Sequence, residues 1–76
     1  MKKYSAILFE SNNYAMWCND SLKQVGLSPK LINVPRYLSS DCGYCIRIET
    51  IHIPKATIIL ENEGIEYEQI AELNEE

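Results

Sequence analysis

The strongest constraint on the fold is the order of apolar patterns along a chain of only 76 residues. Runs rich in β-branched and aromatic residues predict strands over 4–10, 30–34, 44–49 and 66–73. Apolar residues at helical spacing predict one helix that ends at Gly26 and another over 54–64. The order strand, helix, strand, strand, helix, strand is the split βαβ arrangement. We therefore predict an α+β, ferredoxin-like fold (βαββαβ) with two helices on one face of a four-stranded antiparallel sheet.

The length of the chain leaves room for one small hydrophobic core. Because the sequence has no repeat, linker or low-complexity segment, we expect a single domain over 1–76 with an ordered core of about 3–73. The apolar stretch after Lys2 and Lys3 is too short for a secretory signal, and no apolar run approaches the roughly 20 residues of a membrane span. We expect a cytoplasmic protein with reduced thiols and no membrane partner.

The first helix is predicted to begin after the capping side chains of Ser11, Asn12 and Asn13. Its apolar stripe consists of Tyr14, Cys18, Leu22 and Val25. A cysteine on such a stripe is typically a small buried hydrophobe, so we do not expect Cys18 to react.

Strict alternation over 44–49 places Cys45, Arg47 and Glu49 on one face of their strand. The other face is apolar and is expected to pack against the helices; its residues are Tyr44, Ile46 and Ile48. We therefore predict that Cys45 lies on the open face of the sheet. Because an open sheet face often becomes an interface with a second copy of the chain, we predict a homodimer.

The acidic character of the chain is confined to its last residues. Residues 1–60 carry seven basic and four acidic side chains, net +3, whereas 61–76 carry seven acidic side chains and no basic one, net −7. Such charges are typical of solvated helix ends and edge strands. Nucleic-acid affinity depends on Lys and Arg that neutralise phosphates, and no basic stripe exists here. We expect no nucleic-acid partner.

The segment over 35–43 is too long for a tight hairpin and is rich in reactive or polar groups. Cys42 precedes Gly43, whose missing side chain would allow another molecule to approach the sulfur. Arg36 and Arg47 flank the loop and would favour the thiolate, while Asp41 opposes it, so the net effect stays open. Ser39, Ser40 and Asp41 also fit an ordinary polar turn.

The run Pro35-Arg36-Tyr37-Leu38-Ser39-Ser40-Asp41-Cys42-Gly43-Tyr44-Cys45-Ile46-Arg47 resembles the signature of small bacterial selenium/sulfur carrier-like proteins. The resemblance extends to Phe9-Glu10-Ser11 and to the run that begins at Glu61, and so to nearly the whole chain. It implies a carrier that holds sulfur or selenium on a cysteine, which by residue match is Cys42.

Such a carrier would use Cys42 as a nucleophile that accepts sulfur from a donor persulfide. Arg36 and Arg47 would stabilise the anionic persulfide, and Cys45 could resolve it by attacking Cys42. The loop residues expected to assist binding are Ser39, Ser40, Asp41 and Gly43. The expected partners are protein donors and acceptors of sulfur or selenium, such as a cysteine desulfurase. We expect no cofactor, and a carrier or binding protein rather than a turnover enzyme.

Three alternatives stay open at this point. The chain is also compatible with a non-catalytic ferredoxin-like module that binds a ligand or partner, with incidental thiols. The Cys42-Gly43-Tyr44-Cys45 spacing matches a dithiol redox motif, but a strand rather than a helix follows it. The same spacing supplies two metal ligands, so a zinc or iron–sulfur site would need His52 or a second copy of the chain. A loop or capping role for His52 is favoured over ligation.

Overall fold

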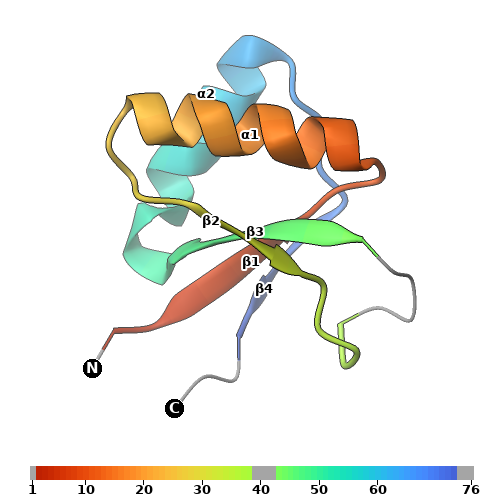
Figure 1. Cartoon of the computed structure of the whole chain (residues 1–76). Helices are drawn as coiled ribbons and strands as arrows, with labels where there is room; N and C mark the ends of the chain where they lie inside the picture. Colours follow the sequence, from red (N-terminus) through yellow and green to blue (C-terminus); the bar gives the residue numbers. More distant parts are fainter. Residues whose placement is uncertain (1, 39–42, 74–76) are drawn as a thin grey trace.

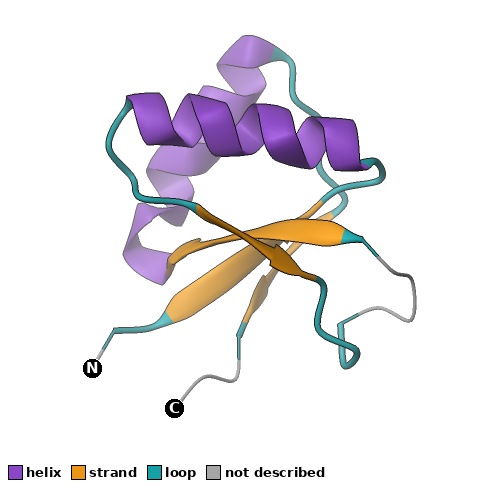
Figure 2. Cartoon of the chain, in the orientation of Figure 1, coloured by secondary structure: helices purple, strands orange, loops and turns teal. Residues whose placement is uncertain are grey.

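The computed structural model describes residues 2–38 and 43–73 (Figure 1). The elements in chain order are β1 (Tyr4–Leu8), α1 (Asn12–Gln24), β2 (Lys30–Asn33), β3 (Tyr44–Glu49), a 3-10 turn (Thr50–His52), α2 (Ile53–Glu63) and β4 (Gln69–Glu72). The four strands form one antiparallel sheet in the order β2-β3-β1-β4. Both helices lie on the same side of this sheet (Figure 2). The predicted α+β, ferredoxin-like architecture is therefore confirmed.

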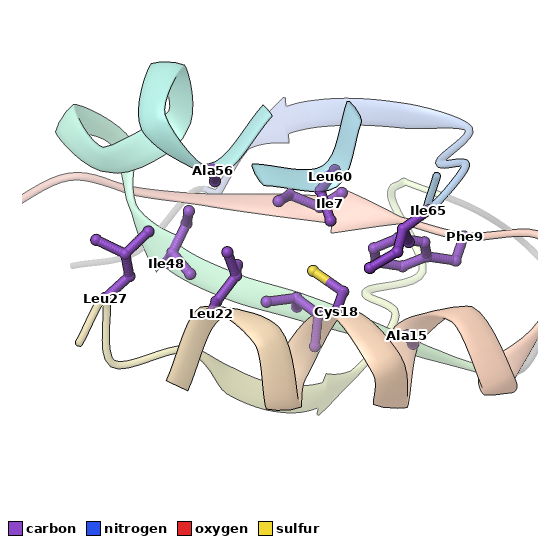
Figure 3. Close-up of a cluster of buried hydrophobic side chains, with 11 residues drawn as sticks. Ile7, Phe9, Ala15, Cys18, Leu22, Leu27, Ile48, Ala56, Leu60 and Ile65 are labelled. Carbon is purple, nitrogen blue, oxygen red and sulfur yellow. The ribbon is translucent and has the colours of Figure 1, made fainter. Parts of the chain in front are cut away.

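The main core lies between the sheet and the two helices (Figure 3). Strand residues Ile7, Ile46 and Ile48 are at most 1 % exposed and meet side chains from both helices. Leu22 of α1 and Leu60 of α2 are completely buried in this cluster. The alternation predicted for β3 thus places Ile46 and Ile48 under the helices, while Tyr44 at the beginning of the strand is exposed.

The predicted signals for the ends of α1 are present. The Ser11 hydroxyl accepts a hydrogen bond from the Tyr14 N–H at 3.4 Å, and Gly26 adopts a φ of +79° just after the helix. Val25 was predicted on the buried stripe, and this is wrong, since it is 45 % exposed. The helix ends at Gln24, so helical spacing no longer applies at Val25, and Leu27 is buried instead.

The second helix follows its prediction closely. Ala56 and Leu60 are buried, Pro54 lies in the first turn, and Gly64 ends the helix at a φ of +74°. The two helices are joined by the Glu63 carboxylate, which accepts hydrogen bonds from Ser21 Oγ at 2.6 Å and Trp17 Nε1 at 3.2 Å. Across the described ranges, no helix is long and apolar enough to cross a membrane.

Candidate functional site

The β2–β3 loop is closed at its base by backbone hydrogen bonds. The Val34 N–H donates to the Gly43 carbonyl at 3.0 Å, which joins the first and last residues of the loop. A turn follows β2, in which the Leu38 N–H donates to the Pro35 carbonyl at 3.0 Å. The other predicted site residues of the loop, Ser39, Ser40, Asp41 and Cys42, lie outside the described residues. The described part therefore defines the two ends between which the candidate cysteine is tethered.

A hydrogen bond joins the first residue of α1 to Tyr44, the residue that directly follows the β2–β3 loop. Asn12 Oδ1 accepts a hydrogen bond from the Tyr44 N–H at 3.2 Å. A Cβ added to Gly43 would lie 3.4 Å from the same oxygen, which is an ordinary van der Waals contact. Gly43 is not among the glycines with positive φ, so its backbone does not require glycine. Figure 1 shows the first turn of α1 and the beginning of β3 on the same side of the molecule.

Sequence reasoning did not assign Asn12 to this site, because an asparagine at a helix start fits a capping role. Capping by Ser11 leaves the Asn12 side chain available for another donor. The partner is 32 residues away in sequence. Local spacing therefore contains no signal for this contact, which depends on the first residues of α1 and β3 lying side by side in the fold.

Cys45 occupies the face opposite the helices, as the alternation predicts, but it is not on an open surface. Its side chain is completely buried in a second cluster with Ala6 and Leu8. The partly buried residues that cover this cluster are Ile32, Val34, Leu38 and Leu73. The prediction of an open face around Cys45 is thus wrong, because the segment after β2 and the residue after β4 fold over it. Burial raises the pKa of the Cys45 thiol to about 11.

Cys18 is completely buried in the main core, as its position on the apolar stripe predicts (Figure 3). Burial, with a smaller contribution from the Glu63 carboxylate, raises the pKa of the Cys18 thiol to about 12. Both described cysteines therefore carry their protons at neutral pH, and neither is a ready nucleophile.

The two arginines predicted to favour the thiolate occupy different surroundings. The Arg47 guanidinium lies over the Tyr4 ring, with Cζ 3.8 Å from the ring centroid. Arg47 is three residues beyond Tyr44, which corresponds to about 10 Å along an extended strand. Arg36 is exposed in the turn after β2. Arg36 thus lies near the beginning of the β2–β3 loop, whereas the Arg47 side chain packs on Tyr4 of β1.

The described residues do not form a metal centre by themselves. Within 2–38 and 43–73, no three His, Cys, Asp or Glu side chains lie close enough to hold a metal ion. His52 immediately precedes α2 at the N-cap position, but its side chain makes no capping hydrogen bond. Its Nδ1 atom is buried and has no hydrogen-bond partner. His52 therefore lies at a capping position, as predicted, but its side chain does not cap the helix by a hydrogen bond.

Comparison with known proteins provides one positive result. A family model described as "Putative Se/S carrier protein-like" matches residues 3–72, nearly the whole chain. Searches of curated proteins and of solved structures give no match. The matched range contains all four strands, both helices and the complete β2–β3 loop. The chain therefore belongs to this family of selenium/sulfur carrier-like proteins.

Proposed function

We propose that this protein carries sulfur or selenium as a persulfide or selenopersulfide on Cys42. The observation that supports this assignment is the burial of the other two cysteines. Cys18 and Cys45 both have an exposed fraction of 0 %, and their pKa values are raised to about 12 and about 11. A carrier thiol must meet a donor protein and ionise, so neither fits the role in this fold. Cys42, in the loop that resembles the family signature, is the cysteine that remains.

Loading is a thiol exchange in which atoms and electrons balance. The Cys42 thiolate attacks the terminal sulfur of a donor persulfide, a new S–S bond forms at Cys42, and the donor leaves as a thiolate. Release reverses the roles: an acceptor thiolate attacks the outer sulfur and Cys42 leaves as a thiolate. Selenium follows the same course when it is the terminal atom. No cofactor or external reductant is consumed in either step.

The loop supplies the remaining groups in this proposal. Arg36, at the loop entrance, and Arg47 provide positive charge toward the anionic persulfide. Ser39, Ser40, Asp41 and Gly43 form the immediate chain surroundings of Cys42. The donor is a protein of the cysteine desulfurase type, and the acceptor presents a thiol. The proposed compartment is the cytoplasm, where thiols remain reduced.

A resolving role for Cys45 is the finer part of the proposal. Its thiolate would attack the inner sulfur of the Cys42 persulfide, which releases sulfide and leaves a Cys42–Cys45 disulfide. At pH 7 a thiol of pKa about 11 is ionised in only about one molecule in ten thousand. Resolution by Cys45 would therefore be slow, so direct transfer to an acceptor is the main route that we propose.

Intact mass spectrometry tests the proposal directly. The wild type, Cys42→Ser and Cys45→Ala proteins are incubated with a cysteine desulfurase and cysteine, then measured before and after treatment with a reductant. We expect a gain of one sulfur atom on wild type and Cys45→Ala, lost on reduction, and no gain on Cys42→Ser. A second series with selenocysteine compares the two elements.

Two results would contradict the assignment. Uptake by Cys42→Ser would place the carrier site elsewhere. No uptake by any protein would favour a non-catalytic module that binds a partner.

A homodimer through the sheet face that contains Arg47 and Glu49 stays a prediction. Analytical ultracentrifugation of the loaded and unloaded protein measures the oligomeric state.

A further inference from the structure

Trp17, the only tryptophan of the chain, lies on an outer flank of α1 and is 44 % exposed. Its ring stacks on Tyr14, one helical turn earlier, with the ring centroids 6.3 Å apart and an angle of 17° between the ring planes. The indole Nε1 donates to Glu63 Oε1 at 3.2 Å. Tryptophan is highly buried on average, whereas this ring is half-exposed and is held both by stacking and by a hydrogen bond. Rigid aromatic surfaces of this kind are frequent anchors of protein interfaces.

The Glu63 carboxylate beside this ring uses only one of its oxygen atoms within the fold. Ser21 Oγ and Trp17 Nε1 both donate to Oε1. Within the described part of the chain, Oε2 accepts no hydrogen bond. The side chain is exposed, and an ionised carboxylate has about four acceptor sites. Glu63 is therefore able to accept further hydrogen bonds from another molecule while it keeps its contacts with α1.

Negative charge predominates around this carboxylate. The last turn of α2 contains Glu61 and Glu63 and has no basic residue. Because the carboxyl end of a helix carries partial negative charge, acidic side chains there are unfavourable for the helix. Asp20 is exposed three residues after Trp17 and so lies on the same flank of α1, whereas helical spacing places Lys23 on another side. Departures from local preference are typical of functional surfaces, and the charge that this surface complements is positive.

We propose that Trp17, Tyr14 and Glu63 form a docking site for an arginine side chain that a protein partner presents. A guanidinium stacks on aromatic rings and donates paired hydrogen bonds to a carboxylate, whereas a lysine ammonium is a compact point charge. The exposed part of the Trp17 ring and the Glu63 Oε2 atom together offer both kinds of contact. The inference goes beyond the proposed transfer of sulfur and does not depend on it, because a carrier and a binding module would both need to recognise a partner.

Peptide titration tests the docking site on the unmodified protein. The two probes are a capped pentalysine peptide and the same peptide with arginine in place of its central lysine, so that they carry equal charge. Trp17 fluorescence and the indole N–H resonance in NMR spectra report on the site itself. At low salt and pH 7 we expect both signals to change saturably. The arginine peptide should bind about 2- to 5-fold more tightly, which is the gain expected from one exposed cation–π contact.

Two variants separate docking at this site from general attraction to an acidic chain. Glu63→Gln keeps an acceptor for Ser21 and Trp17 but removes the charge, and it should weaken binding of the arginine peptide by about 2- to 5-fold. Trp17→Leu should abolish the preference for arginine, which backbone amide resonances then measure. The matched controls are Glu72→Gln, at an exposed carboxylate of β4, and Met16→Leu, at the exposed position before Trp17. Neither control should change the affinity or the preference.

Three results would overturn the proposal. They are equal binding of the two peptides by the wild type, no saturable shift of the Trp17 indole N–H up to millimolar peptide, and equal losses of affinity in Glu63→Gln and Glu72→Gln. If circular dichroism shows that Trp17→Leu is unfolded, Trp17→Phe replaces it and should keep part of the preference for arginine. Uptake of sulfur is measured separately by mass, so failure of the docking site and failure of the carrier function are distinguishable.

Discussion

Alkaline pH should weaken this fold through its two buried thiols. The pKa of Cys18 is raised from 9.0 to about 12, by burial first and by Glu63 second, and that of Cys45 is raised by burial from 9.0 to about 11. In the unfolded chain both thiols ionise near the ordinary value, whereas the folded chain keeps both protons. The stabilisation is therefore complete below about pH 9 and is lost as pH rises toward 11 for Cys45 and 12 for Cys18.

The size of the effect follows from the number of protons retained. Each proton that only the folded state holds lowers the free energy of unfolding by about 1.4 kcal/mol per pH unit. At about pH 10.5 each thiol thus contributes a loss of about 2 kcal/mol, or about 4 kcal/mol together. A domain of 76 residues has a free energy of unfolding of roughly 4–11 kcal/mol. The loss is therefore a large part of the total stability.

Urea unfolding with reductant present, at about pH 7.5, 9 and 10.5, measures this loss in the wild type, Cys18→Ala and Cys45→Ala. Each variant should be less stable than the wild type at neutral pH by about 1–3 kcal/mol, because a small cavity replaces the sulfur. Each should also lose less stability on going to high pH, since one titrating thiol is gone. All other ionisable groups are the same in the three proteins, so their contributions cancel in the comparison. Equal losses in the three proteins would refute the reasoning.

Other predictions concern particular contacts. Under native conditions at neutral pH, iodoacetamide should label Cys42 clearly faster than Cys45 or Cys18, because the latter two thiols are completely buried and their pKa values are raised to about 11 and about 12. Comparable labelling of Cys45, mapped on its peptide, would contradict its burial. Glu63→Ala should lower the free energy of unfolding by about 1–3 kcal/mol, because the buried Ser21 hydroxyl loses its acceptor. Glu63→Gln keeps an acceptor and should lower it less. Urea unfolding followed by Trp17 fluorescence measures both variants, and equal losses would argue against a stabilising hydrogen bond between Ser21 and Glu63. Ser28 has a φ of +53°, so Ser28→Gly should raise the free energy of unfolding by up to about 1 kcal/mol in chemical denaturation, and a decrease would show that the left-handed backbone at this position is not strained.

The sequence predicts the architecture because each element has a strong local signal. Gly64 follows the apolar positions of α2, and the alternation of Ile46 and Ile48 makes β3 one-sided. Once the element order is known, few topologies remain for a chain of this size. Val25 shows where this reasoning stops, because helical spacing does not say at which residue the helix ends.

The surroundings of the site depend on contacts between distant residues, and there the predictions are weaker. Alternation assigns Cys45 to the correct face but not to the interior, since its cover includes Leu38 and Leu73 from outside the regular strands. No local pattern predicts that Asn12 binds the Tyr44 N–H. The sequence likewise gives no signal that the Arg47 guanidinium lies over the Tyr4 ring.

The burial of Cys18 and Cys45 is the strongest argument for the carrier role that we propose for the β2–β3 loop. Burial would disfavour an anionic persulfide on Cys18 or Cys45 for the same reason that it disfavours the thiolate. The core therefore protects these two thiols from unwanted transfer of sulfur, and in the proposed function the transferable sulfur is held on Cys42 of the β2–β3 loop. The described ends of this loop are joined by the Val34–Gly43 hydrogen bond, and Tyr44, the residue after the loop, is hydrogen-bonded to Asn12 at the beginning of α1. We therefore expect donor and acceptor proteins to contact the loop between two ends that the fold holds in place.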